Sequence, residues 1–264
     1  MRGKNLEGYY KNPPVPKDAD SIVNVSGGIE CFASLWWAKE NGLNPIALHL
    51  YNNPNNHPGK DAQLFYAKKQ ADFFGFPLIV EYSHLPAEVS LALMVNMYVS
   101  ACTMLLLGNP RDWKYMVWGG NSEDSLLQRL QLRYPTRAYL AESSFQLDLH
   151  GISGQRFMKA PLQLFPFEML TKSEVLSMVA KNKTLWEFAS KNTWYCYPSL
   201  RDRPHLVEKI KIAKLNGKIV GYKRCGECPK CKEYDNAVQV TNKSYYKQQE
   251  GTFEKRKPKQ EWID

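Results

Sequence analysis

The sequence contains no uninterrupted apolar run near the roughly 20 residues that cross a bilayer, so it predicts no membrane-spanning helix. Its first 20 residues lack the apolar core of a secretory signal and carry prolines suited to an extended arm. Neither an internal repeat nor a long low-complexity segment is present. We therefore expect a cytoplasmic protein that has no membrane partner.

Composition favours a globular protein with an acidic or phosphorylated partner. The chain has 264 residues, enough for a main domain with a small appendage, and 44% of them are hydrophobic. Its formal net charge is +9, and much of the excess follows Lys209. The basic run at 255–259 is more typical of a solvated terminus than of a nucleic-acid arm, so a nucleic acid is one candidate partner and not a required one. The aromatic pairs at 36–37 and 245–246 suggest a homodimer interface.

Strand-like and helix-like patterns alternate along the chain. The expected strands are 21–25, 45–51, 77–82, 115–120 and, more weakly, 156–162. The expected helices between them are 29–42, 60–75, 87–107 and 122–142. This rhythm predicts an α/β fold with a Rossmann-like parallel sheet flanked by helices on both faces. Ligands of such sheets bind at the carboxyl ends of the strands.

The first expected strand runs into a Ser-Gly-Gly turn formed by Ser26, Gly27 and Gly28. Glycines let a ligand approach the backbone closely, and the helix that follows presents unpaired N–H groups at the positive end of its dipole. The turn is therefore a candidate anion site.

A further helix is expected at 171–182. Thr171 and Glu174 have the spacing of a capping box, which places Lys172 in the first turn. A cation there is unfavourable for the helix dipole unless an anion lies nearby. Lys172 is therefore either part of an anion site or a solvent-facing lysine.

Four of the six cysteines form a metal-binding pattern, with Cys196 followed by Cys225, Cys228 and Cys231 in CGECPKC. Two-residue gaps allow thiolates on one turn to reach a tetrahedral ion, and Cys196 is the available fourth ligand. A closed four-thiolate Zn²⁺ site that braces residues 193–264 is the favoured interpretation. Disulfides and an iron–sulfur cluster are the alternatives. The remaining Cys102 lies in an apolar helical pattern typical of a core.

Taken together, these motifs resemble a known family. SGGIEC at 26–31 is similar to the SGGxDS loop of the PP-loop ATP pyrophosphatases. The order of this loop, APL followed by TKSE, TWYCYP and CGECPKC resembles the 7-cyano-7-deazaguanine synthases of the queuosine pathway over roughly residues 20 to 240. The resemblance implies a nucleotide-binding domain at 1–192, with ATP and Mg²⁺ as cofactors. It also implies a ligase that adenylates 7-carboxy-7-deazaguanine and uses ammonia to form first an amide and then a nitrile.

The family pattern also assigns roles to residues. Ser26, Gly27, Gly28 and Lys172 would hold the phosphates of ATP, while Leu50 and Tyr51 would offer backbone groups to adenine. The segment WGGN supplies Gly119, Gly120 and Asn121 near the nucleotide. Glu123 and Asp124 would contact Mg²⁺ or substrate, although they equally fit an N-capped helix. Arg133 and Arg137 would either bind a substrate carboxylate or phosphate or be surface charges.

Two positions depart from the family loop. Glu30 stands where the family has Asp, and Cys31 stands where it has Ser. Both are candidate catalytic residues, together with Ser26 and Lys172. Because a misplacement near 1 Å costs on the order of 100-fold in rate, the altered loop puts catalysis in question. Other PP-loop chemistry, including modification of nucleic acid, and an inactive nucleotide-binding protein are therefore alternatives. His57, in a turn-rich stretch, is either functional or solvated.

Overall fold

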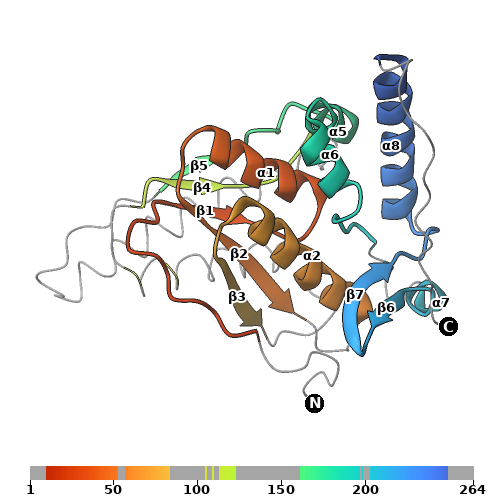
Figure 1. Cartoon of the computed structure of the whole chain (residues 1–264), viewed down its shortest axis with the longest axis horizontal. Coiled ribbons are helices and arrows are strands. Elements are labelled where there is room, and N and C mark those ends of the chain that lie inside the picture. The colour runs from red at the N-terminus through yellow and green to blue at the C-terminus, as the bar shows by residue number, and fades with distance from the viewer. Residues whose placement is uncertain are drawn as a thin grey trace, which may run out of the picture.

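Figure 1 shows the computed structural model of the chain, which describes residues 10–52, 57–83, 105, 109, 113–122, 161–196, 198 and 203–248, with side chains to Thr241. Five parallel strands form one sheet in the order β3-β2-β1-β4-β5. The strands are β1 (Ser21–Asn24), β2 (Pro45–Asn52), β3 (Leu78–Ser83), β4 (Tyr115–Val117) and β5 (Leu162–Leu164). The expected Rossmann-like parallel sheet is confirmed.

The order of the strands reverses at β1. The chain adds β2 and β3 on one side of β1 and then places β4 and β5 on the other side. In sheets of this kind the crevice at the carboxyl ends of the strands, where the order reverses, is the place where ligands bind. Residues 26–28 lie directly beyond β1 and therefore at this switch point.

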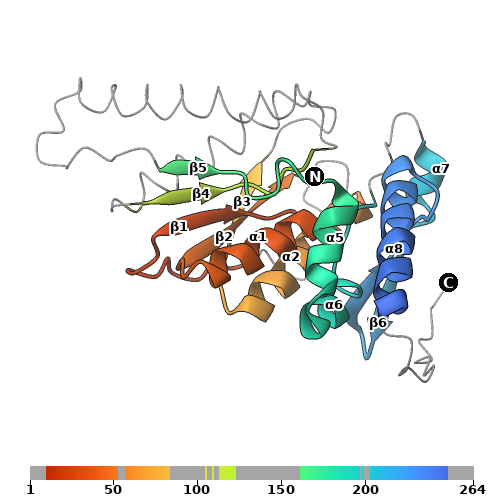
Figure 2. The same ribbon diagram turned by 90° about the horizontal axis from the view of Figure 1, so that it is seen from above.

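Both faces of β1 are buried, as expected for a central strand of a parallel sheet. Ile22 belongs to one core cluster, and its neighbour Val23 belongs to the other. On the face of Val23 the sheet is covered by α1 (Ile29–Glu40) and α2 (Pro58–Phe74), as Figure 2 shows. The helices expected at 87–107 and 122–142 lie almost entirely outside the described residues.

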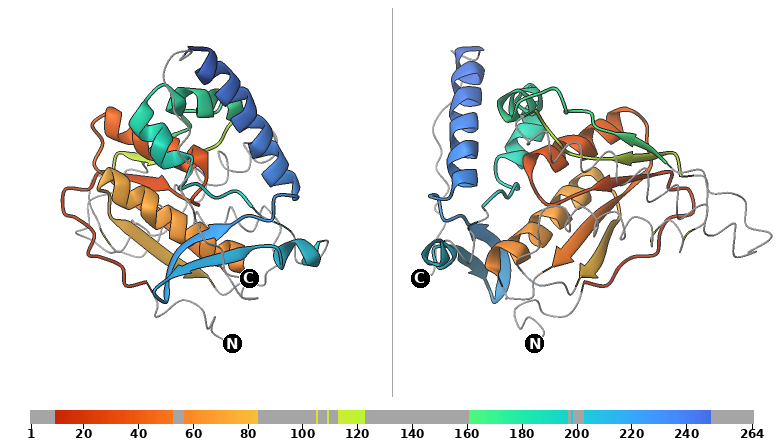
Figure 3. Two further views of the ribbon diagram at one scale, coloured as in Figure 1. Left: turned by 45° about the vertical axis from the view of Figure 1, so that its right-hand side comes forward. Right: turned by 180° about the vertical axis from the view of Figure 1, so that it is seen from behind.

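The C-terminal part packs against α1 and α2. Its elements are α5 (Lys172–Ala180), α6 (Lys183–Ala189), α7 (Pro204–Val207), the antiparallel strands β6 (Lys211–Leu215) and β7 (Lys218–Lys223), and α8 (Pro229–Gln248). Figure 3 shows α8 beside α5 and the β6–β7 hairpin next to α2. The Tyr66 hydroxyl of α2 donates to the Tyr222 carbonyl at 3.2 Å and accepts from the Tyr222 N–H at 3.1 Å. These bonds fix the hairpin to the sheet domain.

The sequence misplaced some boundaries. The strand expected at 115–120 ends at Val117, because the segment containing Gly119 leaves the sheet to pack on α1. Of the strand expected at 156–162, residues 156–160 lie outside the described residues, and β5 begins at Leu162, the last residue of that range. The capping box at Thr171 and Glu174 is confirmed.

The aromatic pair at 36–37 is not a fully exposed surface, because both side chains are half-buried against the core. The side chains at 245–246 lie outside the described ones. No helix that the structure describes is both long and apolar enough to span a bilayer.

Candidate anion site and four-cysteine centre

The turn at residues 26–28, called the glycine turn below, is shaped by its close approach to α2. Gly27 has a φ of +81°, and a Cβ added there would lie 2.8 Å from the Gln63 carbonyl oxygen. Only glycine fits this conformation and this space. Gly28 is the N-cap of α1, and because it has no side chain it makes no side-chain capping hydrogen bond to the helix. The first N–H groups of α1 are thus not covered by a side-chain cap, which suits an anion site.

Gly27→Ala should lower the thermal stability of the protein and distort the turn. A non-glycine residue in the left-handed region costs about 1–3 kcal/mol, and the clash with a backbone oxygen adds to this. We expect Tm to fall by on the order of 5 °C or more in a calorimetric scan. Gly42→Ala is the matched control, since Gly42 has a φ of +66° but no atom within 4 Å of the added Cβ. Equal losses for the two variants would contradict the steric argument.

The glycine turn is held from behind by a buried amide. The Gln70 Nε2 group of α2 donates to the Gly27 carbonyl at 2.8 Å, the Gly28 carbonyl at 3.3 Å and the Asn192 carbonyl at 3.0 Å. The Trp194 N–H donates to the Gly27 carbonyl at 2.7 Å. The turn's carbonyl groups are therefore fixed toward α2 and residues 192–194. Sequence reasoning missed Gln70, although a glutamine among apolar residues of an expected helix was a usable signal.

A cluster of charged and polar side chains, the carboxylate–lysine cluster, lies beside the turn and consists of Glu30, Asn121, Lys172 and Glu233. Lys172 Nζ lies 3.3 Å from Glu30 Oε1 and makes a close ion pair with Glu233 of α8. Asn121 Nδ2 donates to Glu30 Oε1 at 2.9 Å. The structure thus brings together the first turns of α1 and α5, the segment after β4, and α8.

Lys172 is buried, with 6% of its surface exposed, so the interpretation as a solvent-facing lysine is wrong. A lysine in the first turn of a helix needs a negative charge nearby, and Glu30 and Glu233 supply it. Burial alone would lower the pKa of Lys172, but Glu30 and Glu233 outweigh it and raise the pKa. The lysine therefore stays charged. Sequence reasoning missed Glu233, since nothing in the sequence shows that α8 returns to this site.

Cys31 faces the turn as a hydrogen-bonding partner. The Ser26 N–H donates to Cys31 Sγ at 3.2 Å, and Ser26 Oγ lies 3.4 Å from the same sulfur. Burial raises the pKa of the Cys31 thiol. A nucleophilic thiol at a helix N-terminus needs the opposite shift, so the site does not favour thiolate chemistry.

Other candidates near the turn have visible structural roles. A Cβ at Gly119 would lie 3.0 Å from the Glu30 carbonyl carbon, so this glycine permits close packing on α1. Leu50 and Tyr51 lie near the carboxyl end of β2, and the Tyr51 hydroxyl donates to Asp61 at 2.5 Å. Gly120 is half-buried in the segment that follows β4. The described residues do not include Glu123, Asp124, Arg133, Arg137 and Cys102.

His57 is a structural N-cap rather than a solvated loop residue. Its Nδ1 accepts from the Gly59 N–H at 2.9 Å, and its Nε2 lies 3.0 Å from the Pro198 carbonyl oxygen. Burial lowers the pKa of His57, which favours the neutral ring with its proton on Nε2. His57 therefore ties the start of α2 to the segment that carries Cys196.

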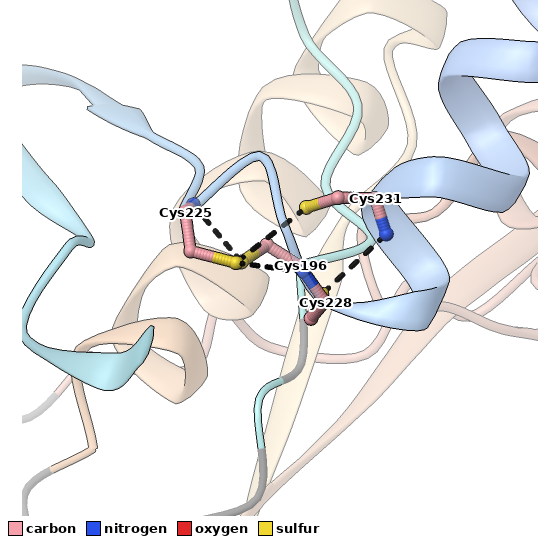
Figure 4. A group of neighbouring side chains, drawn as sticks. All are labelled: Cys196, Cys225, Cys228 and Cys231. Atoms are coloured by element: carbon pink, nitrogen blue, oxygen red, sulfur yellow. Dashed lines mark hydrogen bonds between the residues drawn. The ribbon is translucent and has the colours of Figure 1, made fainter. Parts of the chain in front are cut away.

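The four cysteines of the expected metal site come together in the four-cysteine centre shown in Figure 4. Their sulfur atoms all lie within 4.8 Å of one another, and all four residues are buried. Cys225 Sγ is 3.4 Å from Cys196 Sγ and 3.9 Å from Cys231 Sγ. The described cysteines form no disulfide. The disulfide alternative is therefore wrong for these four.

The centre has the backbone hydrogen bonds that suit cysteine ligands of a metal. The N–H groups of Cys225, Cys228 and Cys231 each donate to a cysteine sulfur at 3.3–3.4 Å. A hydrogen bond from the Cys196 thiol lowers the pKa of Cys231. Metal–sulfur bonds of about 2.3 Å in a tetrahedron place sulfurs about 3.8 Å apart, close to the observed separations. In a four-iron cluster each cysteine binds a different iron, which spreads the sulfurs further.

The described fold and site define a Rossmann-like α/β protein with a candidate anion site at the switch point and a four-cysteine centre behind it. No protein-family model and no curated protein matches the chain.

Three solved structures are similar in fold. NMN synthetase from Francisella tularensis has 13% identity and a TM-score of 0.39, with 87% of each chain covered. The U34-tRNA thiolase from Methanococcus maripaludis with its [4Fe-4S] cluster has 15% identity and a TM-score of 0.42, covering 82% of this chain and 80% of that one. A 4-thiouridine synthetase in complex with RNA and bound ATP has 14% identity and a TM-score of 0.39, covering 86% and 53%. Similarities this weak leave the function to be argued from the chain's own residues.

Proposed function

We propose that the protein is a PP-loop enzyme that binds ATP at the glycine turn, adenylates a carboxylate and releases pyrophosphate. The observation that carries this proposal is the position of Lys172. A buried, charged lysine from α5 reaches the first turn of α1, at the strand end where the sheet order reverses. Backbone N–H groups and a fixed cation together suit a chain of phosphates.

The residues supply binding and charge neutralisation. The N–H groups at the start of α1 would face the phosphates, and Lys172 would stabilise the negative charge that develops when the α-phosphate is attacked. To do so, Lys172 must exchange one of its two carboxylate partners for phosphate oxygens. Mg²⁺ bound with ATP would supply further charge neutralisation, and Glu30 offers it an oxygen ligand beside the turn.

For the substrate, we propose 7-carboxy-7-deazaguanine or a close relative. Its carboxylate oxygen would attack the α-phosphate, giving an acyl adenylate and pyrophosphate, and ammonia would displace AMP to form the amide. A second adenylation of the amide oxygen, followed by loss of AMP and protons, would give the nitrile. The support is the order of sequence motifs together with the convergence of three of them: the glycine turn contacts Trp194 of TWYCYP and lies beside Lys172 of TKSE.

We propose that the four-cysteine centre holds Zn²⁺. The sulfur separations fit one tetrahedral ion, and four protein ligands leave no open position for a catalytic water. The metal would therefore brace the protein and take no part in the reaction.

Incubating the metal-loaded protein with ATP, Mg²⁺, ammonia and 7-carboxy-7-deazaguanine should release AMP and pyrophosphate and give the nitrile. Pyrophosphate is measured by a coupled assay and the nitrile by mass spectrometry. Omitting the deazaguanine should reduce pyrophosphate release to background. Pyrophosphate release with another carboxylate, but not with this one, would contradict the substrate and retain the reaction class.

A nucleotide-binding protein without turnover is the second candidate. It is favoured by the contact in which Cys31 Sγ takes the Ser26 N–H, a donor that a phosphate could otherwise use. In that case calorimetry detects ATP binding, but the protein releases no pyrophosphate. The double variant Glu30→Asp/Cys31→Ser should then release pyrophosphate. ATP that neither binds nor turns over would contradict both candidates.

A further inference from the structure

The β6–β7 hairpin, called the lysine hairpin below, has charges of one sign only. Lys211, Lys214, Lys218 and Lys223 lie on its two strands, and no acidic residue occurs between Lys209 and Glu227. All four lysines are exposed. Lys211, Lys214 and Lys218 have no carboxylate partner within the described part of the chain. The hairpin therefore presents a basic surface in which three lysines have no carboxylate partner among the described residues.

The strand register places the lysines at both ends of the hairpin. Lys211 and Lys223 are direct cross-strand partners at the open end, and like charges in this arrangement are destabilising. Lys214 and Lys218 lie near the turn, about 10 Å further along at the usual rise per residue. The lysines are therefore spread over the length of the hairpin, which suits an extended polyanion better than one small anion.

The hairpin is held rigidly. Its inner side packs on α2 and the four-cysteine centre through Ile212, Ile219 and Tyr222. The two hydrogen bonds between Tyr66 and Tyr222 fix its distance from α2. A surface fixed in this way binds a partner without paying a large ordering cost.

The hairpin also lies near the candidate anion site. Figure 1 and the right-hand view of Figure 3 show it beyond the carboxyl ends of β2 and β3, next to the start of α2. A long polyanion bound along the hairpin would therefore pass the edge of the sheet at which the glycine turn lies.

We propose that the lysine hairpin binds the phosphate backbone of a nucleic acid. Phosphate contacts from lysines position a nucleic acid but do not read its bases. The hairpin exposes Leu215 and Val220 but no aromatic side chain that could stack on bases or anchor at a membrane interface. Binding should therefore be strongly salt-dependent and weakly dependent on sequence. This inference does not rest on the proposed adenylation.

The test is fluorescence anisotropy with the full metal-loaded protein and short labelled strands of RNA, single-stranded DNA and duplex DNA. The variant Lys211→Glu/Lys214→Glu/Lys218→Glu should weaken binding at least about tenfold near 0.1 M salt. Loss of three phosphate contacts should reduce the slope of log K against log salt by about 2 for single strands and by about 3 for duplex DNA. Comparison of the three probes identifies which nucleic acid is preferred. The neutral variant with glutamine at the same three positions should show an intermediate loss.

The matched control is Lys11→Glu/Lys17→Glu/Lys181→Glu, which changes net charge equally at exposed lysines outside the hairpin. It should retain binding within about threefold, because these lysines lie outside the hairpin that the proposal assigns to the phosphates. Equal losses for both variants would overturn the proposal, since net charge alone would then explain binding. No binding by the unchanged protein, or tighter binding to phosphatidylserine vesicles than to any nucleic acid, would also overturn it. Circular dichroism and metal content verify that the variants fold.

Discussion

Lys172→Met is expected to reduce kcat/KM for ATP-dependent pyrophosphate release at least about 100-fold, the cost typical of removing one group that stabilises developing charge. The physical reason is that Lys172 is the buried cation beside the glycine turn. ATP binding, measured by calorimetry, should weaken as well. The substitution also leaves Glu30 and Glu233 without their shared cation, so the protein should lose on the order of 3 kcal/mol of stability.

Two further variants separate loss of the cation from loss of the fold. Lys181→Met removes an exposed lysine at the end of α5 and should leave both ATP binding and the reaction unchanged. Glu233→Gln removes one carboxylate that competes with phosphate for Lys172, so ATP should bind at least as tightly as before. If Glu233→Gln weakened ATP binding as much as Lys172→Met, the assignment of Lys172 to the phosphates would be contradicted.

Removing the metal is expected to have the largest effect on stability. The purified protein should contain about one zinc per chain and no iron, because the sulfur separations fit one tetrahedral ion. Cys228→Ser, or a strong chelator, should lower Tm by more than about 10 °C, since binding of a structural zinc ion contributes directly to folding free energy. Plasma emission spectroscopy and calorimetry provide the two measurements.

Cys31→Ser is the matched control for this experiment, because Cys31 is also a buried cysteine but lies outside the four-cysteine centre. It should retain the full metal content. Detection of iron together with visible absorbance would show that the centre holds an iron–sulfur cluster and would contradict the assignment of zinc. A metal-free protein with an unchanged Tm would contradict a metal-binding centre altogether.

The four-cysteine centre is also linked to the candidate anion site through one short segment. Asn192 accepts from Gln70, Trp194 donates to Gly27, and Cys196 belongs to the four-cysteine centre. On the other side of the centre, α8 carries Cys231 and, two residues later, the Glu233 that pairs with Lys172. Loss of the metal should therefore disturb both the carbonyl groups of the turn and the partner of its lysine. ATP binding should weaken in Cys228→Ser even below its melting temperature.

Local patterns were sufficient for much of the fold. The strands at β1, β2 and β3 alternate with helices at a regular spacing, which specifies a parallel sheet because parallel strands need crossover connections. Thr171 and Glu174 form the expected capping box because both groups lie within one helical turn. Strand ends were less predictable, as the early end of β4 shows, because they depend on where a glycine meets a neighbouring helix.

The candidate site divides in the same way. Glycine at position 27, a lysine at the start of a helix and four cysteines at metal-binding spacing could all be recognised from residue type and spacing alone. The roles of Gln70, Glu233 and His57 could not, because each acts through a partner distant in the sequence.

The sequence by itself therefore determined the parallel α/β architecture, the turn after the first strand and the set of sulfur ligands, since each depends on interactions within a few residues or on periodicity. Only the tertiary structure decided that Lys172 is buried between Glu30 and Glu233, that Cys31 hydrogen-bonds within the turn, and that the four-cysteine centre lies behind it. Such contacts join segments far apart along the chain. Their geometry is set by the packing of helices on the sheet, which no local pattern encodes.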